Sequence, residues 1–135
     1  MDPVLVDTDV FSFFFRKDPL HELYIPDVLN RELFLSFQSV AELYRWTIER
    51  NWGQPRRDSL ERALRFYTIL PFDDQLARHW AEIVAMRKRA GTSIACGDAW
   101  IAATATRFAL PLISHNGRHF TGIANLKVIC HATTT

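Results

Sequence analysis

Short apolar runs alternate along this chain with longer segments in which apolar residues recur at helical spacing. The short runs predict strands at 4–6, 33–37, 68–72, 110–113 and 127–130. The longer segments predict helices at 10–15, 38–50, 58–67, 74–90 and 98–109. Strands that alternate with helices are typical of a parallel sheet covered on both faces. The pattern therefore predicts an α/β protein, and because no linker interrupts it we expect a single domain over 1–135.

Local signals set the expected ends of several helices. The stretch 51–55 contains glycine and proline and is expected to separate two helices. Asp58 followed by Glu61 resembles a capping box that would open the next helix, and the acidic pair 73–74 would cap the helix after it. Within 38–50, one face of the helix is predicted to point to the core. That face consists of Val40, Leu43, Tyr44, Thr47 and Ile48.

Five polar side chains stand where predicted strands end or predicted helices begin. Asp7 and Asp9 directly follow the first strand, and Asn116 follows the fourth. Glu42 lies early in the helix after the second strand. Asp98 opens a nearly apolar helix, where an unpaired charge is costly. Because ligands bind at the carboxyl ends of parallel strands, we expect these side chains to gather at that edge of the sheet.

Each of these residues also has a purely structural interpretation. Asp7, Asp9 or Asp98 would serve as a helix N-cap, a position that favours aspartate. Glu42 lies opposite the apolar face of its helix and would be a solvated side chain. Asn116 followed by glycine is a common turn signal. The histidines show no spacing suited to zinc. The pattern alone leaves the structural and the functional interpretations open.

Composition narrows the class of protein. Of the 135 residues, 48% are hydrophobic and 23% are charged, which is usual for a folded globular domain. The apolar runs are too short for a membrane span, and the N-terminus does not resemble a signal peptide. The two cysteines, Cys96 and Cys130, are too few for a disulfide framework. We therefore expect a cytoplasmic protein with no membrane partner.

Charge is distributed unevenly, although the formal net charge is only +1. Between 45 and 65, six arginines stand against three acidic residues. Such a cluster is either a solvated helix face or a surface that contacts phosphate. If Asp7, Glu42 and Asp98 are neutralised by cations, the formal charge of +1 becomes +4, which suits a nucleic-acid partner. The four tryptophans are either core residues or part of a dimer interface.

Four segments together resemble the landmarks of PIN-domain proteins, in particular the VapC-type toxins of bacterial toxin–antitoxin pairs. They are VLVDTDVF near the N-terminus, SFQSVAELYRW at 36–46, GDAWIAATA at 97–105 and PLISHNGRHF at 111–120. The resemblance covers essentially the whole chain, in the right order. It implies a three-layer α/β/α sandwich with a central parallel sheet. It also implies an acidic site made of Asp7, Glu42 and Asp98, with Asn116 at the position of a further polar residue.

The same resemblance implies a Mg²⁺-dependent endoribonuclease that cleaves RNA phosphodiester bonds, forms a homodimer and is inhibited by a cognate antitoxin protein. Hard carboxylate oxygens suit Mg²⁺, and also Mn²⁺. Asp7 and Asp98 would be direct metal ligands. Glu42 would bind through a water or orient the attacking water. Asn116 would contact a metal-bound water or the scissile phosphate.

Two other functions fit parts of the sequence. His119 stands where similar PIN domains often have a further acid, and Asp9 stands where asparagine is common. The missing acid favours a catalytically weak RNA-binding or protein-interaction domain. The D-T-D turn at 7–9 resembles the nucleophile turn of phosphatases that form an aspartyl-phosphate. Phe11 and Ala102 then break the phosphatase pattern.

Overall fold

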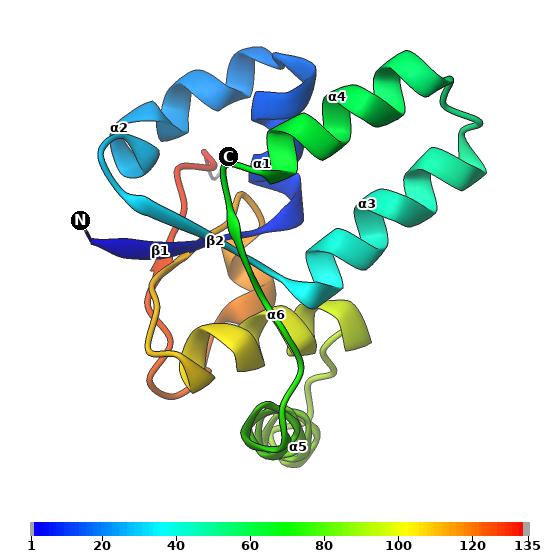
Figure 1. Cartoon of the computed structure of the whole chain (residues 1–135). Coiled ribbons are helices and arrows are strands. Elements are labelled where there is room, and N and C mark those ends of the chain that lie inside the picture. The colour runs from blue at the N-terminus through cyan, green and yellow to red at the C-terminus, as the bar shows by residue number, and fades with distance from the viewer. Residues whose placement is uncertain (1, 134–135) are drawn as a thin grey trace.

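The computed structural model describes residues 2–133, and its centre is a sheet of five parallel strands. The strand order is β3-β2-β1-β4-β5, so the first strand lies in the middle of the sheet (Figure 1). The bounds are β1 Pro3–Val6, β2 Glu32–Ser36, β3 Thr68–Leu70, β4 Leu112–Ile113 and β5 Val128–Ile129. All five predicted strands are present, and their parallel order confirms the α/β class.

Helices cover both faces of the sheet, which is therefore the middle of three layers (Figure 1). Helices α1, α3 and α4 and the 3₁₀ helix η1 share a core with one face, and α5 and α6 share a core with the other. The bounds are α1 Thr8–Arg16, η1 Pro19–Tyr24, α2 Ile25–Val28, α3 Phe37–Glu49, α4 Gln54–Leu64, α5 Asp74–Arg89, α6 Cys96–Arg107 and η2 Gly117–Phe120. The predicted α/β/α sandwich is confirmed.

The central strand β1 is held between the two cores. Val4 and Val6 belong to the core with α1, α3 and α4, whereas Leu5 belongs to the core with α5 and α6. None of the three side chains is exposed. Successive residues of a strand point to opposite faces, and full burial of each such side chain contributes roughly 1.5–3 kcal/mol. The position where β1 ends is therefore firmly fixed.

Two helices begin earlier than the sequence signals predict. Helix α4 begins at Gln54, because Pro55 fits the first turn, where its missing N–H costs nothing. Asp58 is therefore not a cap, and instead accepts a hydrogen bond of 2.8 Å from Gln54 Nε2. Helix α6 begins at Cys96, which places Asp98 in its first turn. The N-cap of α6 is Ala95, so of the two interpretations left open for Asp98 the capping one is excluded.

The face that α3 buries matches the predicted one only in part. Leu43 and Thr47 are buried and Val40 packs against the core, as predicted, whereas Tyr44 is 47% exposed and Ile48 is 67% exposed. Ser39, which is not part of the predicted face, is also buried and receives a hydrogen bond of 2.8 Å from the side chain of the first residue of α1. The buried face is therefore turned toward this small polar residue.

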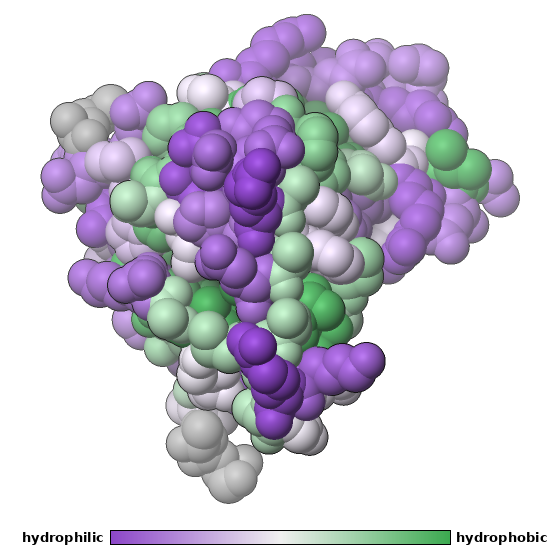
Figure 2. Space-filling view, turned by 90° about the horizontal axis from the view of Figure 1, so that it is seen from below, coloured by the Kyte–Doolittle hydropathy of each residue, from purple (hydrophilic) through white to green (hydrophobic). Residues whose placement is uncertain are grey.

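The surface mixes polar and apolar side chains. Seen from below, hydrophilic residues predominate and hydrophobic residues gather in separate small areas (Figure 2). All four tryptophans are partly buried against one of the two cores. Within residues 2–133, no helix has the length and apolar character needed to cross a membrane.

The segment between α1 and β2, for which the pattern predicted no element, folds as η1 and α2. Its anchor is Tyr24, which is fully buried. The Tyr24 hydroxyl is hydrogen-bonded to His115 Nδ1 at 2.6 Å and accepts a hydrogen bond of 3.0 Å from the backbone N–H of His131. One side chain thus joins this segment to the loops that follow β4 and β5.

Replacement of Tyr24 by Phe tests this anchor. We expect the free energy of unfolding to fall by about 1–2 kcal/mol, because the backbone N–H of His131 loses its acceptor while the ring still fills the core. Urea unfolding at pH 8 measures the difference. Tyr44→Phe removes the same hydroxyl from an exposed ring and should change stability by less than about 0.5 kcal/mol. Equal effects of the two substitutions would contradict the anchoring role.

Candidate active site

Asp7 lies at the carboxyl end of β1 and is almost fully buried, with 5% of its surface exposed. It is the N-cap of α1, since its Oδ1 accepts a hydrogen bond of 2.7 Å from the backbone N–H of Thr8. Its Oδ2 accepts a hydrogen bond of 2.7 Å from the hydroxyl of Ser114, which follows β4. Asp7 therefore joins the ends of two neighbouring strands while it caps a helix.

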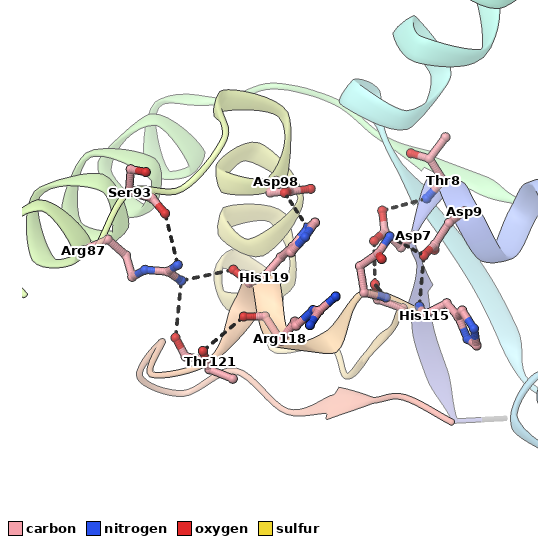
Figure 3. A network of polar contacts seen from close by, with 12 residues as sticks. Asp7, Thr8, Asp9, Arg87, Ser93, Asp98, His115, Arg118, His119 and Thr121 are labelled. Atoms are coloured by element: carbon pink, nitrogen blue, oxygen red, sulfur yellow. Dashed lines mark hydrogen bonds and ion pairs between the residues drawn. The ribbon is translucent and has the colours of Figure 1, made fainter. Parts of the chain in front are cut away.

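Asp9 lies in the first turn of α1 and binds the loop after β4 (Figure 3). Its Oδ1 accepts a hydrogen bond of 2.7 Å from the backbone N–H of Val10. Its Oδ2 accepts hydrogen bonds of 3.0 Å from the backbone N–H of His115 and from Asn116 Nδ2. The structure thus brings Asn116 to the same strand ends as Asp7, as the alternation of strands and helices predicts.

Asp98 lies on the other side of the site, in the first turn of α6. Its Oδ2 is 3.1 Å from Nδ1 of His119, which belongs to η2. In Figure 3 this pair lies between the cluster around Asp7 and the polar contacts of Arg87. The charge of Asp98 raises the pKa of both Asp7 and Asp9, so the three carboxyl groups are close enough to repel one another.

Glu42 lies on α3 and approaches the start of α6. Its Oε1 accepts a hydrogen bond of 2.9 Å from Gln38 Nε2. A Cβ atom built on Gly97 would lie 3.1 Å from the same Glu42 oxygen and 3.0 Å from Gln38 Nε2, which is tighter than ordinary contact. The glycine therefore lets α3 and α6 approach closely. Glu42 is partly buried beside the helix turn that carries Asp98, so the alternative in which it is simply a solvated side chain is not supported.

Burial dominates the electrostatics of the site. Burial, then the charge of Asp9 and, more weakly, that of Asp98 raise the pKa of Asp7 from 3.8 to about 8, although the hydrogen bonds from Ser114 and Thr8 lower it. Burial also raises the pKa of Asp9, with a smaller contribution from the charge of Asp98. Without a counter-charge, Asp7 therefore keeps its proton near neutral pH.

The donor set fits a hard divalent cation. Carboxylate oxygens are the ligands that Mg²⁺ and Mn²⁺ prefer, and a cation would offset the burial and the repulsion that raise the pKa of Asp7 and Asp9. Within residues 2–133, however, no three His, Cys, Asp or Glu side chains are grouped closely enough to enclose an ion. An ion held by two carboxylates would keep several waters, which is usual for Mg²⁺.

A network that the sequence does not reveal holds His119 in place (Figure 3). Arg87, near the end of α5, donates hydrogen bonds to the backbone carbonyls of Ser93 at 3.2 Å, His119 at 3.1 Å and Thr121 at 3.3 Å. These bonds join η2, which carries His119, to the loop that leads into α6, which carries Asp98. One guanidinium group therefore helps to position both partners of the Asp98–His119 contact. No local sequence signal identifies Arg87, because its acceptors are carbonyls from distant segments.

Comparison with known proteins gives consistent similarities over nearly the whole chain. Residues 4–126 match the family model described as the PIN domain. The chain is 29% identical over 125 residues to Toxin FitB of Neisseria gonorrhoeae, covering 87% of this chain and 90% of that protein. It is 28% identical over 123 residues to Ribonuclease VapC2 of Haemophilus influenzae, covering 91% and 93%. A solved structure described as a member of the VapBC family of toxin–antitoxin systems from Mycobacterium tuberculosis has a TM-score of 0.73 at 27% identity, covering 97% of this chain and 100% of that one.

The raised pKa of Asp7 predicts how stability depends on pH. Between pH 4 and pH 8 the folded protein keeps a proton on Asp7 that the unfolded chain releases, so the free energy of unfolding should fall as pH rises. In Asp7→Asn the side chain has no carboxyl group to titrate, and its shape is close to that of protonated aspartate. In metal-free buffer, its stability relative to the unchanged protein should therefore rise by up to ~1.4 kcal/mol per pH unit and level off above pH 8.

Urea unfolding of both proteins from pH 4 to pH 9 measures this difference. The comparison at pH 4 is the control, since Asp7 is protonated in the folded state there and the two side chains then differ little. A stability difference that is the same at every pH would show that Asp7 is ionised in the folded protein.

Proposed function

Since the chain belongs to the PIN domain family, we propose that it is a metal-dependent endoribonuclease and the toxin of a toxin–antitoxin pair. The observation that carries this proposal is the cluster of Asp7, Asp9 and Asp98 at the carboxyl ends of the central strands, where burial and mutual repulsion raise the pKa of two of the three. Such a cluster is costly in a folded protein unless a cation or another positive group binds there.

Four residues have defined parts in this proposal. Asp7 and Asp98 would hold Mg²⁺ or Mn²⁺ directly, and Glu42 would act through a water. A bound ion supplies polarisation of a phosphoryl oxygen and a lowered pKa for its water. Asn116 would contact a metal-bound water or the scissile phosphate. Its amide nitrogen is engaged by Asp9, so its side-chain oxygen is the atom left for such a contact.

The other residues of the site fix the ligands. Thr8 and Ser114 hold one oxygen of Asp7 each, which sets the orientation of that carboxyl group. His119 contacts one oxygen of Asp98 and leaves the second free. Preorganised ligands of this kind favour catalysis, because little reorganisation is needed when substrate binds.

The relatives support the substrate and the partner. One is named a toxin, another a ribonuclease, and a solved relative comes from a family of toxin–antitoxin systems. We therefore propose RNA as the substrate and an antitoxin protein as the inhibitor. An arginine from that protein would pair with the acidic cluster and compete with the metal.

A homodimer and a cytoplasmic location complete the proposal. Several large apolar side chains are exposed, among them Phe66 at 80% and Ile48 at 67%, and a second copy would cover such side chains. Cys96 and Cys130 are both free, which suits a reducing compartment.

One observation favours a second candidate, a catalytically weak domain that binds RNA or protein. His119 stands beside Asp98 where a further acid would add to the ligand set, and no group of three metal-ligating side chains is enclosed within residues 2–133. The phosphatase alternative has no such support. Asp7 is almost fully buried and each of its oxygens accepts a hydrogen bond, so neither oxygen is presented to a substrate as a nucleophile.

Cleavage of RNA by the purified, antitoxin-free protein tests the proposed function. We expect cleavage with Mg²⁺ or Mn²⁺ and none after EDTA. Asp98→Asn and Asp7→Asn should each lower the rate by at least ~100-fold, because each removes a direct metal ligand, which supplies several kcal/mol of stabilisation. Glu61→Gln removes an exposed acid from α4, outside the site, and should cleave at the unchanged rate.

Two results would contradict the proposal. Undiminished cleavage in both aspartate variants would remove the acidic cluster from the mechanism. RNA binding without cleavage, together with no heat of Mg²⁺ binding at millimolar concentration in calorimetry, would favour the second candidate.

A further inference from the structure

A groove between α1 and α3 opens beside the acidic site. Its volume is about 160 Å³, and its lining includes Asp9 near the site and Arg16, Trp46, Arg50 and Trp52 along its walls. Asp9 is the only acidic residue in that lining. A concave surface with this composition starts at the proposed reaction centre and continues toward the arginine-rich segment of α3 and α4.

Arg50, which lines this groove, and Arg56, which lies over the lining residue Trp52, each pack against an aromatic ring. The guanidinium carbon of Arg50 is 4.8 Å from the centre of the Trp46 ring. That of Arg56 is 4.1 Å from the centre of the Trp52 ring, whose other neighbour is the stacked ring of Phe15 at 5.7 Å. The rings thus restrict the rotamers of both arginines before any ligand arrives, which lowers the entropy lost on binding.

The charges of these two arginines are not used elsewhere in the described part of the chain. Neither Arg50 nor Arg56 makes an ion pair within residues 2–133. Their neighbours differ: Arg45 pairs with Glu49 at 2.9 Å, and Arg57 donates hydrogen bonds to backbone carbonyls. Cation–π contact leaves the hydrogen-bonding edge of a guanidinium available. Arg50 and Arg56 are therefore suited to an anionic ligand.

We propose that this groove binds single-stranded RNA next to the scissile phosphate, with Arg50 and Arg56 contacting its phosphates and offering flat surfaces to its bases. This inference rests on the proposed function and names the path of its substrate. Guanidinium groups bind phosphate in a bidentate manner and stack on unpaired bases. A hollow of this size accepts one base or one phosphate, whereas a duplex is too wide to enter it.

The charges favour RNA over a protein segment in this groove. A segment that neutralises the acidic cluster must bring a positive group, and Arg16, Arg50 and Arg56 would repel it along the groove. The arginines attract the phosphates of an RNA strand along the groove. Only bare carboxylates at its inner end would repel them. A cation bound by the carboxyl groups would remove that repulsion at the inner end of the groove, where Asp9 lies.

Binding of a short fluorescent single-stranded RNA in EDTA tests the groove without cleavage. In Arg50→Gln/Arg56→Gln we expect the dissociation constant to rise roughly 10- to 30-fold. The slope of log affinity against log salt should fall by about 1.4, since each lost phosphate contact contributes about 0.7. Arg78→Gln removes one charge from α5, far from the groove, and should bind RNA as the unchanged protein does. Circular dichroism and thermal unfolding establish that every variant is folded.

A second variant separates charge from geometry. Arg50→Lys/Arg56→Lys keeps both charges but loses the planar group, so the salt slope should be retained while affinity still falls. Full affinity in this variant would show that only charge matters and would overturn the stacking part of the proposal.

Failure of the groove and failure of the proposed function give different results. An unchanged dissociation constant and salt slope in the glutamine variant, with cleavage intact, would overturn the groove alone. A protein that binds RNA through the groove but never cleaves it would overturn the nuclease and leave the groove. If the glutamine variant binds RNA as before but no longer copurifies with an antitoxin, the groove binds a protein segment, and the inference is overturned.

Discussion

The site depends on one constraint, the burial of Asp7 at the carboxyl end of the central strand. β1 is covered on both faces, so the chain must turn into α1 where water cannot satisfy its backbone groups. Asp7 satisfies one of them as the N-cap and accepts a second hydrogen bond from Ser114 on the next strand. Capping and the proposed chemistry are therefore not exclusive. The same carboxyl group can serve both, because the burial that raises its pKa is a cost that a positive ligand would offset.

The order of the strands brings Asp7 and Asn116 together, but it is not sufficient to complete this site, because Glu42 and Asp98 reach it only where helices approach closely. Small residues stand at each of these points. Ser39 lets α3 reach the turn after β1, and Gly97 lets α6 reach Glu42. A larger side chain at either position would separate two parts of the acidic cluster without disturbing the sheet. The site is thus more sensitive to local packing than the fold is.

The sequence pattern predicted the elements better than their contacts. Hydrophobic periodicity located all five strands, and the rule for carboxyl ends of strands placed Asp7, Asp98 and Asn116 in one region. The buried face of α3 was predicted only in part, because the pattern does not reveal that the small polar Ser39 is buried while Tyr44 and Ile48 are exposed. Arg87 could not be found at all, since it binds backbone carbonyls whose positions depend on the tertiary structure. Contacts between elements, rather than the elements themselves, are what a single sequence leaves undetermined.

The formal charge of +1 results from two opposed regions rather than from an absence of electrostatic function. Carboxyl groups are concentrated at the strand ends, and arginines with unpaired charge lie beside the groove that leads there. An RNA phosphate that enters this groove meets attraction first and repulsion at the inner end, unless the carboxyl groups are neutralised. Binding of a cation and binding of RNA should therefore be positively coupled, because each ligand lowers the electrostatic cost of the other. If the proposed function holds, the protein would therefore bind RNA most firmly when the metal proposed for cleavage is also present.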